Sequence, residues 1–579
     1  MKLFRIVLVC AFFLTAPAIA CADLDFRTGP PDGIQTTTST LADVLALNAR
    51  AEGKRLDSFA SRIEEWTAKS QGYDSTSKTM WLGKDYKTLH SFGPFTRQDG
   101  RIGGVRWEQN INGLVVIMGG VHPEDDDFER EMQAARAGSP GDSVKLLGEV
   151  TAPVIAYVIE VRPAGDPPTW LFIEKSSGQE VREESVYGAV RTTSTFSEFK
   201  TFSGAVVATK IATSNGEPAY DSTATLTSMR LNVPVPAADL NLPASRRDLV
   251  QFPAGATSVK IPVTMPFSEN ERIISDRDYA VPSGTGKSHI VVRVVINGRG
   301  LDLALDSGAS GILLDKDVAT QLGLARYGAS GQTVEGEAGG TRVLIPEMHI
   351  GELIMKNVAA YEGRFEMRTA DTEQVVGLLG FDFIASVGLK VDWDKHEVTA
   401  YPQGTMQMPD GGVTIPLRLD DYVPDISVSV GDASSDRFVL DTGSGAMIIP
   451  ILRGGGFVDV AAGGVLIFPG FSAAHPNETR DQGLGHTTQL LIPEVYLGVV
   501  GGVAKGYPVQ LKRVVFGAPF EQFLAVVIDP SSRWGGQDLD GLIGYGFLHY
   551  FNLYFDYPNS RIVLEPNDQF RNAKHVPPH

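Results

Sequence analysis

The chain carries the triplet Asp-Ser/Thr-Gly twice, inside two segments that repeat each other. The first copy is Asp306–Gly308 and the second is Asp441–Gly443, and each copy follows an apolar stretch typical of a buried strand. Each half later reaches an apolar pair between glycines, at Gly377–Gly380 and Gly541–Gly544. This repeat constrains the fold more than any other feature, because each copy is expected to form the same supersecondary unit.

From these glycines onward the two halves align without a gap, Gly377–Pro402 against Gly541–Pro566. The identical pairs are Gly377/Gly541, Leu378/Leu542, Gly380/Gly544, Phe383/Phe547, Leu389/Leu553, Asp392/Asp556 and Pro402/Pro566. The sequence therefore predicts two lobes of the same fold, each with one Asp-Ser/Thr-Gly loop.

The paired triplets and the paired apolar-Gly segments resemble the pepsin/retropepsin superfamily of aspartic peptidases. The resemblance covers roughly residues 250–566. It implies an all-β, two-lobed acid-protease-like fold in which both loops reach a shared cleft that binds a protein or peptide substrate.

The chemistry of that family needs two carboxylates held close together. Two such groups cannot both ionise at low cost, so they share one proton and supply a base and an acid together. We therefore predict Asp306 and Asp441 as the catalytic dyad, with roles that exchange during turnover. This chemistry uses no metal or cofactor, and the histidines of the chain show no metal-ligand spacing.

The residues beside the aspartates are expected to support the dyad. Gly308 and Gly443 allow a close backbone approach that a Cβ would obstruct, and the resemblance implies that the hydroxyls of Ser307 and Thr442 cross-brace the loops. The fifth motif position differs between the copies, being Ser310 in the first and Gly445 in the second.

Glycine-rich segments at the family's flap position occur in both lobes. They are Glu335–Gly340, with Gly339 and Gly340, and Gln482–His486, with Gly483 and Gly485. The first lacks the tyrosine typical of pepsin-like flaps, which favours a fused pair of retropepsin-like units. An ordinary glycine-rich hairpin without a substrate role remains the alternative.

The N-terminus predicts export. A short basic start is followed by the apolar run Ile6–Leu14 and by Ala18-Ile19-Ala20. This pattern is typical of a secretory signal peptide and is too short to span a membrane. Cys21 at the cleavage junction resembles a bacterial lipobox, so two alternatives stay open: a lipoprotein acylated at Cys21 and anchored in the outer membrane, or a soluble periplasmic protein. Cys10 lies in the signal peptide, which excludes an intrachain disulfide framework.

The formal net charge of −18 argues against nucleic-acid binding, because such binding needs a basic surface. The length of the chain allows two or three domains. We predict a signal peptide at 1–20, an N-terminal α+β domain at 22–232, a Pro-rich linker at 233–249, lobe 1 at 250–407 and lobe 2 at 408–579.

The N-terminal domain is expected to be a helix followed by an antiparallel β meander. Leu41, Val44 and Leu45, and then Leu56, Phe59 and Ile63, recur at helical spacing around Gly53, which indicates one helix or a helix pair. This order resembles the half-barrel of lipoprotein carrier and assembly proteins of the bacterial envelope. Expected strands are Gly113–Met118, Val154–Val161, Trp170–Glu174, Val186–Thr193 and Phe199–Ile211.

These patterns together predict an exported aspartic endopeptidase. Because both aspartates lie in one chain, a catalytic monomer is expected, and pairing of lobes between two copies is the alternative. A different class also stays open, in which the chain is a catalytically silent peptide- or lipid-binding envelope protein on a peptidase-like scaffold. Retention of both aspartates and both neighbouring hydroxyl residues favours the enzyme.

Overall fold

The computed structural model describes residues 25, 27, 29–118, 123–163, 167–187, 190–265, 290–333, 336–339, 341–363, 375–419, 422–430, 433–444, 448–450, 465–466, 495–499, 502–528 and 541–572. These residues divide into two compact units. Unit 1 extends to Ser245 and also includes Tyr327–Thr333, whereas unit 2 contains Arg246–Arg326 and the chain from Val334 onward.

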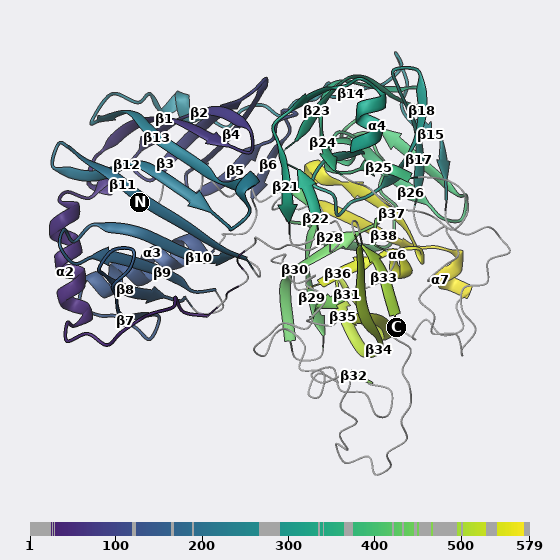
Figure 1. Cartoon of the computed structure of the whole chain (residues 1–579). Coiled ribbons are helices and arrows are strands. Elements are labelled where there is room, and N and C mark those ends of the chain that lie inside the picture. Colours follow the sequence, from purple (N-terminus) through teal and green to yellow (C-terminus); the bar gives the residue numbers. More distant parts are fainter. Residues whose placement is uncertain are drawn as a thin grey trace, which may run out of the picture. The chain divides into compact units, whose positions relative to one another are not determined.

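Unit 1 is built on one antiparallel sheet, which in the described residues has 13 strands in the order β6-β5-β4-β3-β2-β1-β13-β12-β11-β10-β9-β8-β7 (Figure 1). The strands are β1 (Ser61–Ser70), β2 (Tyr73–Leu82), β3 (Asp85–Phe92), β4 (Phe95–Ile102), β5 (Val105–Gln109), β6 (Val115–Met118), β7 (Val144–Val150), β8 (Ala156–Val161), β9 (Thr169–Glu174), β10 (Glu180–Tyr187), β11 (Val190–Phe202), β12 (Ala205–Ser214) and β13 (Ser222–Leu231). The predicted α+β class, a helix followed by an antiparallel meander, is confirmed.

Two helices pack on the end of this sheet formed by β7, β8 and β9. Helix α2 (Leu41–Glu52) begins at a capping box between Thr40 and Asp43, and its C-cap is Gly53 at a φ of 67°. It buries Val44 and Leu45 beside residues of α3 (Pro123–Arg136) and of the three strands. Burial of such an apolar stripe, more than helix propensity, holds a helix of this length in place.

Of the two alternatives for this region, the structure has the single helix and not the helix pair. Leu56–Ser58 forms only a single 3-10 turn, and Ile63 lies in β1. Strand β1 hydrogen-bonds to β2 on one side and to β13 on the other, so long-range pairing overrides the local helical spacing.

Residues expected to form the linker pack on the sheet of unit 1. Val233, Val235 and Leu240 form a small core with Ile63 and Met80. The carbonyl oxygens of Asn241 and Ala244 accept hydrogen bonds from the side chains of Lys87 and Gln109, at 3.2 Å each.

Unit 2 contains a sheet for each lobe. Lobe 1 runs β14-β24-β19-β25-β18-β17-β23-β20, and lobe 2 runs β29-β30-β36-β31-β35-β34-β32 within the described part of the chain, with β16 paired to β17 and β33 to β34. The strands of lobe 1 are β14 (Val250–Gln251), β16 (Val263–Thr264), β17 (Val291–Ile296), β18 (Arg299–Leu305), β19 (Ile312–Asp315), β20 (Ala325–Tyr327), β23 (Arg342–Ile350), β24 (Leu353–Gly363) and β25 (Val375–Leu379). Those of lobe 2 are β29 (Asp425–Val430), β30 (Ala433–Asp441), β31 (Ile448–Pro450), β32 (Val465–Leu466), β33 (Val495–Val499), β34 (Gly502–Phe516), β35 (Ala518–Ile528) and β36 (Gly541–Gly544).

The lobes repeat the same strand pairings, as the sequence predicts. In lobe 1, β18 pairs parallel to β25, which pairs antiparallel to β19. In lobe 2, β30 pairs parallel to β36, which pairs antiparallel to β31. Short helices follow β19, β25, β36 and the last strand of the chain: α4 (Lys316–Gln321), α5 (Phe381–Ile384), α6 (Tyr545–Leu548) and α7 (Asp568–Asn572).

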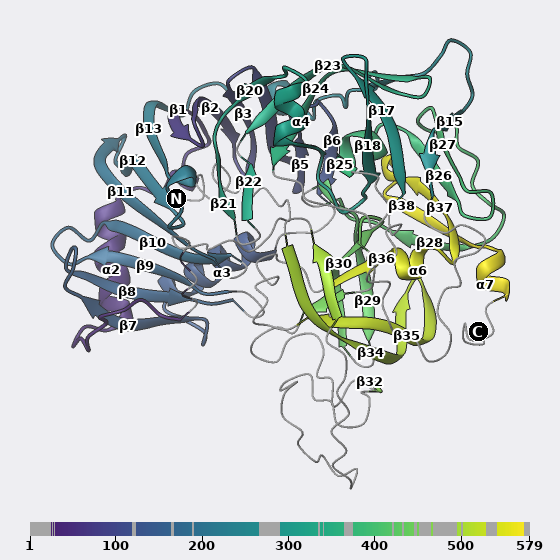
Figure 2. The same ribbon diagram turned by 45° about the vertical axis from the view of Figure 1, so that its right-hand side comes forward.

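A third sheet joins the lobes, in the order β15-β27-β26-β37-β38-β28 over the described residues (Figure 2). Its strands are β15 (Val259–Ile261), β26 (Gly388–Asp392), β27 (Glu397–Tyr401), β28 (Val413–Pro416), β37 (Phe551–Asp556) and β38 (Arg561–Pro566). The pairing of β26 with β37 places Val391 opposite Leu553, so one chain supplies both halves of the sheet. The predicted all-β two-lobed fold is confirmed.

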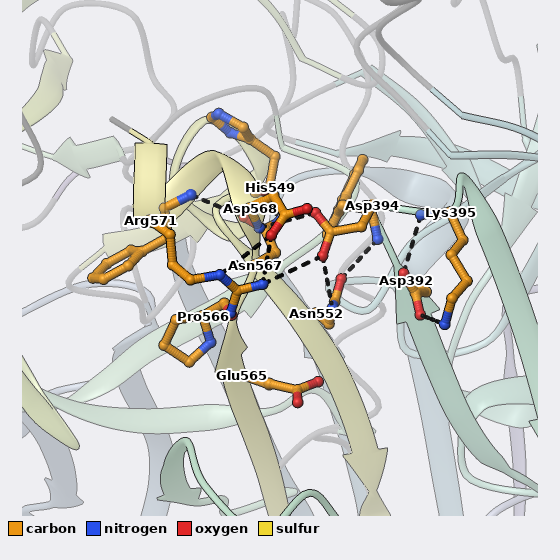
Figure 3. Close-up of polar contacts among 12 residues, drawn as sticks. Asp392, Asp394, Lys395, His549, Asn552, Glu565, Pro566, Asn567, Asp568 and Arg571 are labelled. Atoms are coloured by element: carbon orange, nitrogen blue, oxygen red, sulfur yellow. Dashed lines mark hydrogen bonds and ion pairs between the residues drawn. The ribbon is translucent and has the colours of Figure 1, made fainter. Parts of the chain in front are cut away.

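Polar side chains fasten one end of this shared sheet (Figure 3). Asn552 of β37 accepts a hydrogen bond from Trp393 N at 2.9 Å, and Asp394 accepts one from Asp568 N at 3.0 Å. Arg571 Nη2 lies 4.0 Å from Asp394 Oδ2. The turn after β26 is thereby tied to both β37 and α7.

Candidate active site

The two predicted catalytic aspartates stand at the ends of equivalent strands. Asp306 follows β18, and its backbone N–H donates to Leu379 O of β25 at 3.1 Å. Asp441 ends β30, opposite Gly544 of the parallel strand β36. Parallel pairing with a glycine-bracketed strand thus fixes the direction in which each loop leaves its sheet.

The glycines of the two loops bring the carboxylates together. A Cβ at Gly308 would lie 2.6 Å from Cγ of Asp441, and a Cβ at Gly443 would overlap Cγ of Asp306 still more closely. Real Cβ contacts are longer than this. Each carboxylate therefore lies against the backbone of the opposite loop, at a distance that only glycine permits.

The hydroxyls of Ser307 and Thr442 brace the loops across the lobe boundary. Ser307 Oγ accepts from Thr442 N at 3.0 Å, and Thr442 Oγ1 accepts from Ser307 N at 3.0 Å. Each hydroxyl then donates to the other lobe's strand, Ser307 to Leu440 O and Thr442 to Leu305 O, both at 2.8 Å. Both side chains are buried. This reciprocal brace fixes one loop against the other.

Each aspartate is also oriented by its own loop. Gly308 N donates to Asp306 Oδ1 at 2.8 Å, and Gly443 N donates to Asp441 Oδ1 at 2.7 Å. A carboxylate that accepts backbone N–H groups is held in one orientation and favours its charged form.

Burial opposes that effect and raises the pKa of both carboxyl groups. For Asp306, burial is the largest cause, and the negative charge of Asp441 and the hydrogen bond with it raise the pKa further. For Asp441, burial raises the pKa, while hydrogen bonds from Asp306 and from backbone N–H groups partly offset it. The two carboxyl groups therefore titrate as one unit, and their titration belongs to the pair rather than to either residue.

Tyr557, which the sequence did not single out, is a buried tyrosine whose pKa responds to both aspartates. It is buried, its ring is 6.1 Å from that of Phe381, and its pKa is raised by burial and by the charges of both aspartates. The backbone N–H of Phe381 donates to Ala309 O, so the Phe381 ring beside Tyr557 is connected to the loop that contains Asp306. The available signal was the gapless alignment, which places Tyr557 opposite the large aromatic residue Trp393.

The remaining predicted site residues are only partly described. Gly339 ends β22 (Gly336–Gly339), which pairs with β21 (Ser330–Thr333) in a two-stranded sheet. Gly340, Gly483, Gly485 and Cys21 lie outside the described residues. The flap and lipidation roles stay predictions.

Residues 292–383 match the family model described as aspartyl protease. The match contains Asp306–Gly308 and the segment Gly377–Gly380, which confirms the predicted family resemblance for lobe 1. A search of curated proteins gave no match.

Solved structures of two kinds are among those similar to parts of the chain. A retropepsin-like aspartic protease from Rickettsia conorii is 24% identical and covers 19% of this chain and 81% of its own, with a TM-score of 0.15. A LolA superfamily protein from Nitrosomonas europaea is 11% identical and covers 35% of this chain and 99% of its own, with a TM-score of 0.26. A DUF1329 family protein from Desulfovibrio piger is 15% identical and covers 35% and 98%, with a TM-score of 0.25.

Among the described residues, no helix is both long enough and apolar enough to cross a membrane.

Proposed function

We propose that the chain is an aspartic endopeptidase whose dyad is Asp306 and Asp441. The observation that carries this proposal is the reciprocal brace between Ser307 and Thr442, which holds two buried carboxyl groups against each other's loops. Two surface turns would need no such brace.

In the proposed reaction, the ionised carboxylate of Asp441 takes a proton from a water molecule as the water oxygen bonds to the carbonyl carbon of the substrate. The carboxyl group of Asp306 gives its proton to the carbonyl oxygen. The resulting tetrahedral diol collapses with cleavage of the C–N bond, and the leaving nitrogen takes up the proton held by Asp441. Asp306 recovers its own proton from the diol, so the dyad returns to its starting state.

The partner in this proposal is a protein or peptide that binds in an extended form, and neither nucleic acid nor a cofactor takes part. Both aspartates come from one chain, so the active form is a monomer. We further propose that the protein is exported to the bacterial periplasm or anchored in the outer membrane through a lipidated Cys21. Mass spectrometry of the mature N-terminal peptide, with Cys21→Ala as the control, tests the anchor.

The decisive test compares the mature protein with Asp441→Asn on an unfolded, peptide-diverse substrate from acidic to neutral pH. New peptide termini, identified by mass spectrometry, should appear with the wild type and vanish with the variant. Termini that persist in the variant would assign the cleavage to a contaminant. Binding without cleavage by the wild type would instead favour a catalytically silent peptide- or lipid-binding envelope protein.

A further inference from the structure

The loop that carries Asp306 lies against the start of α5. The backbone N–H of Phe381 donates to Ala309 O at 2.9 Å. A Cβ at Gly380 would overlap the carbonyl oxygens of both Ala309 and Gly311. The far end of the loop is therefore seated directly on the residues that follow β25, at a distance that only glycine permits.

Gly311, which ends this loop, contacts the side chains of Asp382 and Tyr361. A Cβ at Gly311 would lie 3.0 Å from Asp382 Oδ2 and 3.0 Å from Tyr361 Cε2, which is tighter than nine in ten real Cβ contacts. Asp382 is 2% exposed, and Ser386 Oγ donates to its carbonyl oxygen at 2.6 Å. The buried carboxyl group of Asp382 thus forms one side of the space at Gly311.

Tyr361 of β24 forms the other side of that space. It packs on the apolar core cluster that contains Ala309 and Leu313. The guanidinium carbon of the buried Arg342 lies 5.2 Å from the centre of the Tyr361 ring, within the range of a cation–π contact. Because the ring is held from two directions, a methyl group at Gly311 would have to be accommodated by a shift of the loop or of Asp382.

Strand pairing shows which residues of lobe 2 correspond to these. Leu313 lies opposite Leu378 where β19 pairs with β25, and Ile448 lies opposite Leu542 where β31 pairs with β36. Leu378 and Leu542 are an identical pair of the repeat. The loops of the two lobes therefore correspond without a gap from their aspartates to these strands.

On this register the two lobes carry opposite combinations of large and small residues. Lobe 2 has Ala446 in place of Gly311 and Gly546 in place of Asp382. The lobe with the larger residue in its loop thus has the smaller residue after its glycine-bracketed strand. Such an exchange is expected when two positions fill one space, because packing tolerates changes that conserve the total volume.

We propose that Asp382 is a positioning residue of the candidate active site, whose contact with Gly311 holds the Asp306 loop in place for catalysis. The inference rests on the peptidase function proposed above. Asp382 acts through the loop and does not touch the reacting atoms. A loop shifted by a few tenths of an ångström misplaces the Asp306 carboxyl group, and such misplacement slows the chemical step.

The contact is tested by hydrogen exchange on the full chain, which needs no catalysis. Gly311→Ala should make exchange of the Phe381 amide about tenfold faster, because the loop that contains its acceptor is displaced. Gly411→Ala, which adds a methyl group in open space, should exchange like the wild type. Unchanged exchange in Gly311→Ala overturns the contact, whatever the enzyme does.

Exchanging the pair for that of lobe 2 tests the positioning role. Gly311→Ala and Asp382→Gly should each lower kcat about tenfold, with little change in KM. The double variant Gly311→Ala/Asp382→Gly should recover most of the wild-type kcat, because the methyl group then enters the space that the carboxyl group leaves. Asp317→Gly, which removes an exposed carboxylate from α4 of the same lobe, should keep the wild-type kcat.

The single variants are assayed at a temperature at which circular dichroism shows them folded. Independent losses in the double variant, about 100-fold in total, overturn the positioning role. A lower melting temperature of the single variants with unchanged kcat also overturns it, because a merely structural contact would give that result. If the wild type does not cleave, the proposed function fails and the positioning role with it, whereas the exchange experiment still decides the contact.

Discussion

Lobe 1 and lobe 2 present their carboxylates in loops whose hydrogen bonds match one for one. In both loops the glycine N–H donates to its own aspartate, and a hydroxyl reaches the main chain of the other lobe. The surroundings of the carboxylates nevertheless differ, since Asp306 is 8% exposed and Asp441 is more open. Backbone N–H groups of Gly443, Gly308 and Ser444 lower the pKa of Asp441 and partly offset the effect of its burial. A symmetric backbone frame can therefore hold two carboxyl groups in unequal surroundings.

Replacing either carboxylate should have the largest effect. Asp306→Asn and Asp441→Asn should each lower kcat/KM by about 10³-fold or more, because the acid and the base of the reaction both come from this pair. Initial rates on a cleavable peptide measure the loss. If only one of the two variants lost its activity, the lobes would not contribute equally, because the carboxylate of a single lobe would then be enough for catalysis.

Adding a methyl group to the glycine of either loop should have the second-largest effect. Gly308→Ala and Gly443→Ala place a Cβ against the opposite carboxylate and should lower kcat at least about 100-fold by displacing it. Gly411, where a Cβ has open space, provides the matched control as Gly411→Ala. A mild effect of Gly308→Ala would contradict the contact between its loop and Asp441.

Loss of a bracing hydroxyl should act through both stability and rate. Ser307→Ala or Thr442→Ala leaves buried polar groups without their partners and should lower the free energy of unfolding by about 1–3 kcal/mol. Urea unfolding of the two variants and of Thr442→Ser, which keeps the hydroxyl, compares the lobes directly. If the two alanine variants lost clearly different amounts of unfolding free energy, the two hydroxyls would contribute unequally to stability although their hydrogen-bond distances are the same.

The raised pKa of Asp306 predicts how stability depends on pH. Because its folded-state pKa lies above the unfolded value, its stabilising contribution is complete below the unfolded pKa and is lost as pH rises through the folded pKa. Wild type should therefore lose stability between about pH 4 and neutral pH, and Asp306→Asn should lose less. Parallel urea curves at acidic and neutral pH measure the difference, and equal pH dependence in the two proteins would contradict the raised pKa.

Loss of the fastening shown in Figure 3 should have the smallest effect. Asn552→Ala removes the acceptor for Trp393 N and should cost about 1 kcal/mol in the free energy of unfolding, with little change in activity. Thermal unfolding measures the cost. A large loss of activity would mean that this end of the shared sheet also sets the geometry of the dyad.

Sequence alone predicted the duplicated lobes and the close approach of Asp306 and Asp441, because an internal repeat reports long-range structure without an alignment. The strands of unit 1 were predicted less accurately, because pairing between distant strands decides where they begin and end. The expected strand Phe199–Ile211 contains the hairpin turn at Ser203 and Gly204, whose φ values of 51° and 92° separate β11 from β12. The Ser-Gly pair was the available signal.

The expected strand Val186–Thr193 likewise spans the end of β10 and the start of β11. Strands β1 to β5 were not predicted at all, since their alternation is interrupted by polar residues on the buried face such as Thr79, Thr88 and His90. Tyr327 carries no sequence signal for its place in unit 1, because its ring partners lie far away in the chain.

The shared sheet formed by β26 and β37 has a genetic consequence. When two identical chains form such a pair of lobes, any substitution appears on both sides of the symmetry axis. Here one gene encodes both lobes in tandem, so a codon for one loop can change while its counterpart stays as it was. The two aspartate loops can therefore be changed independently by selection, and also by the experimenter.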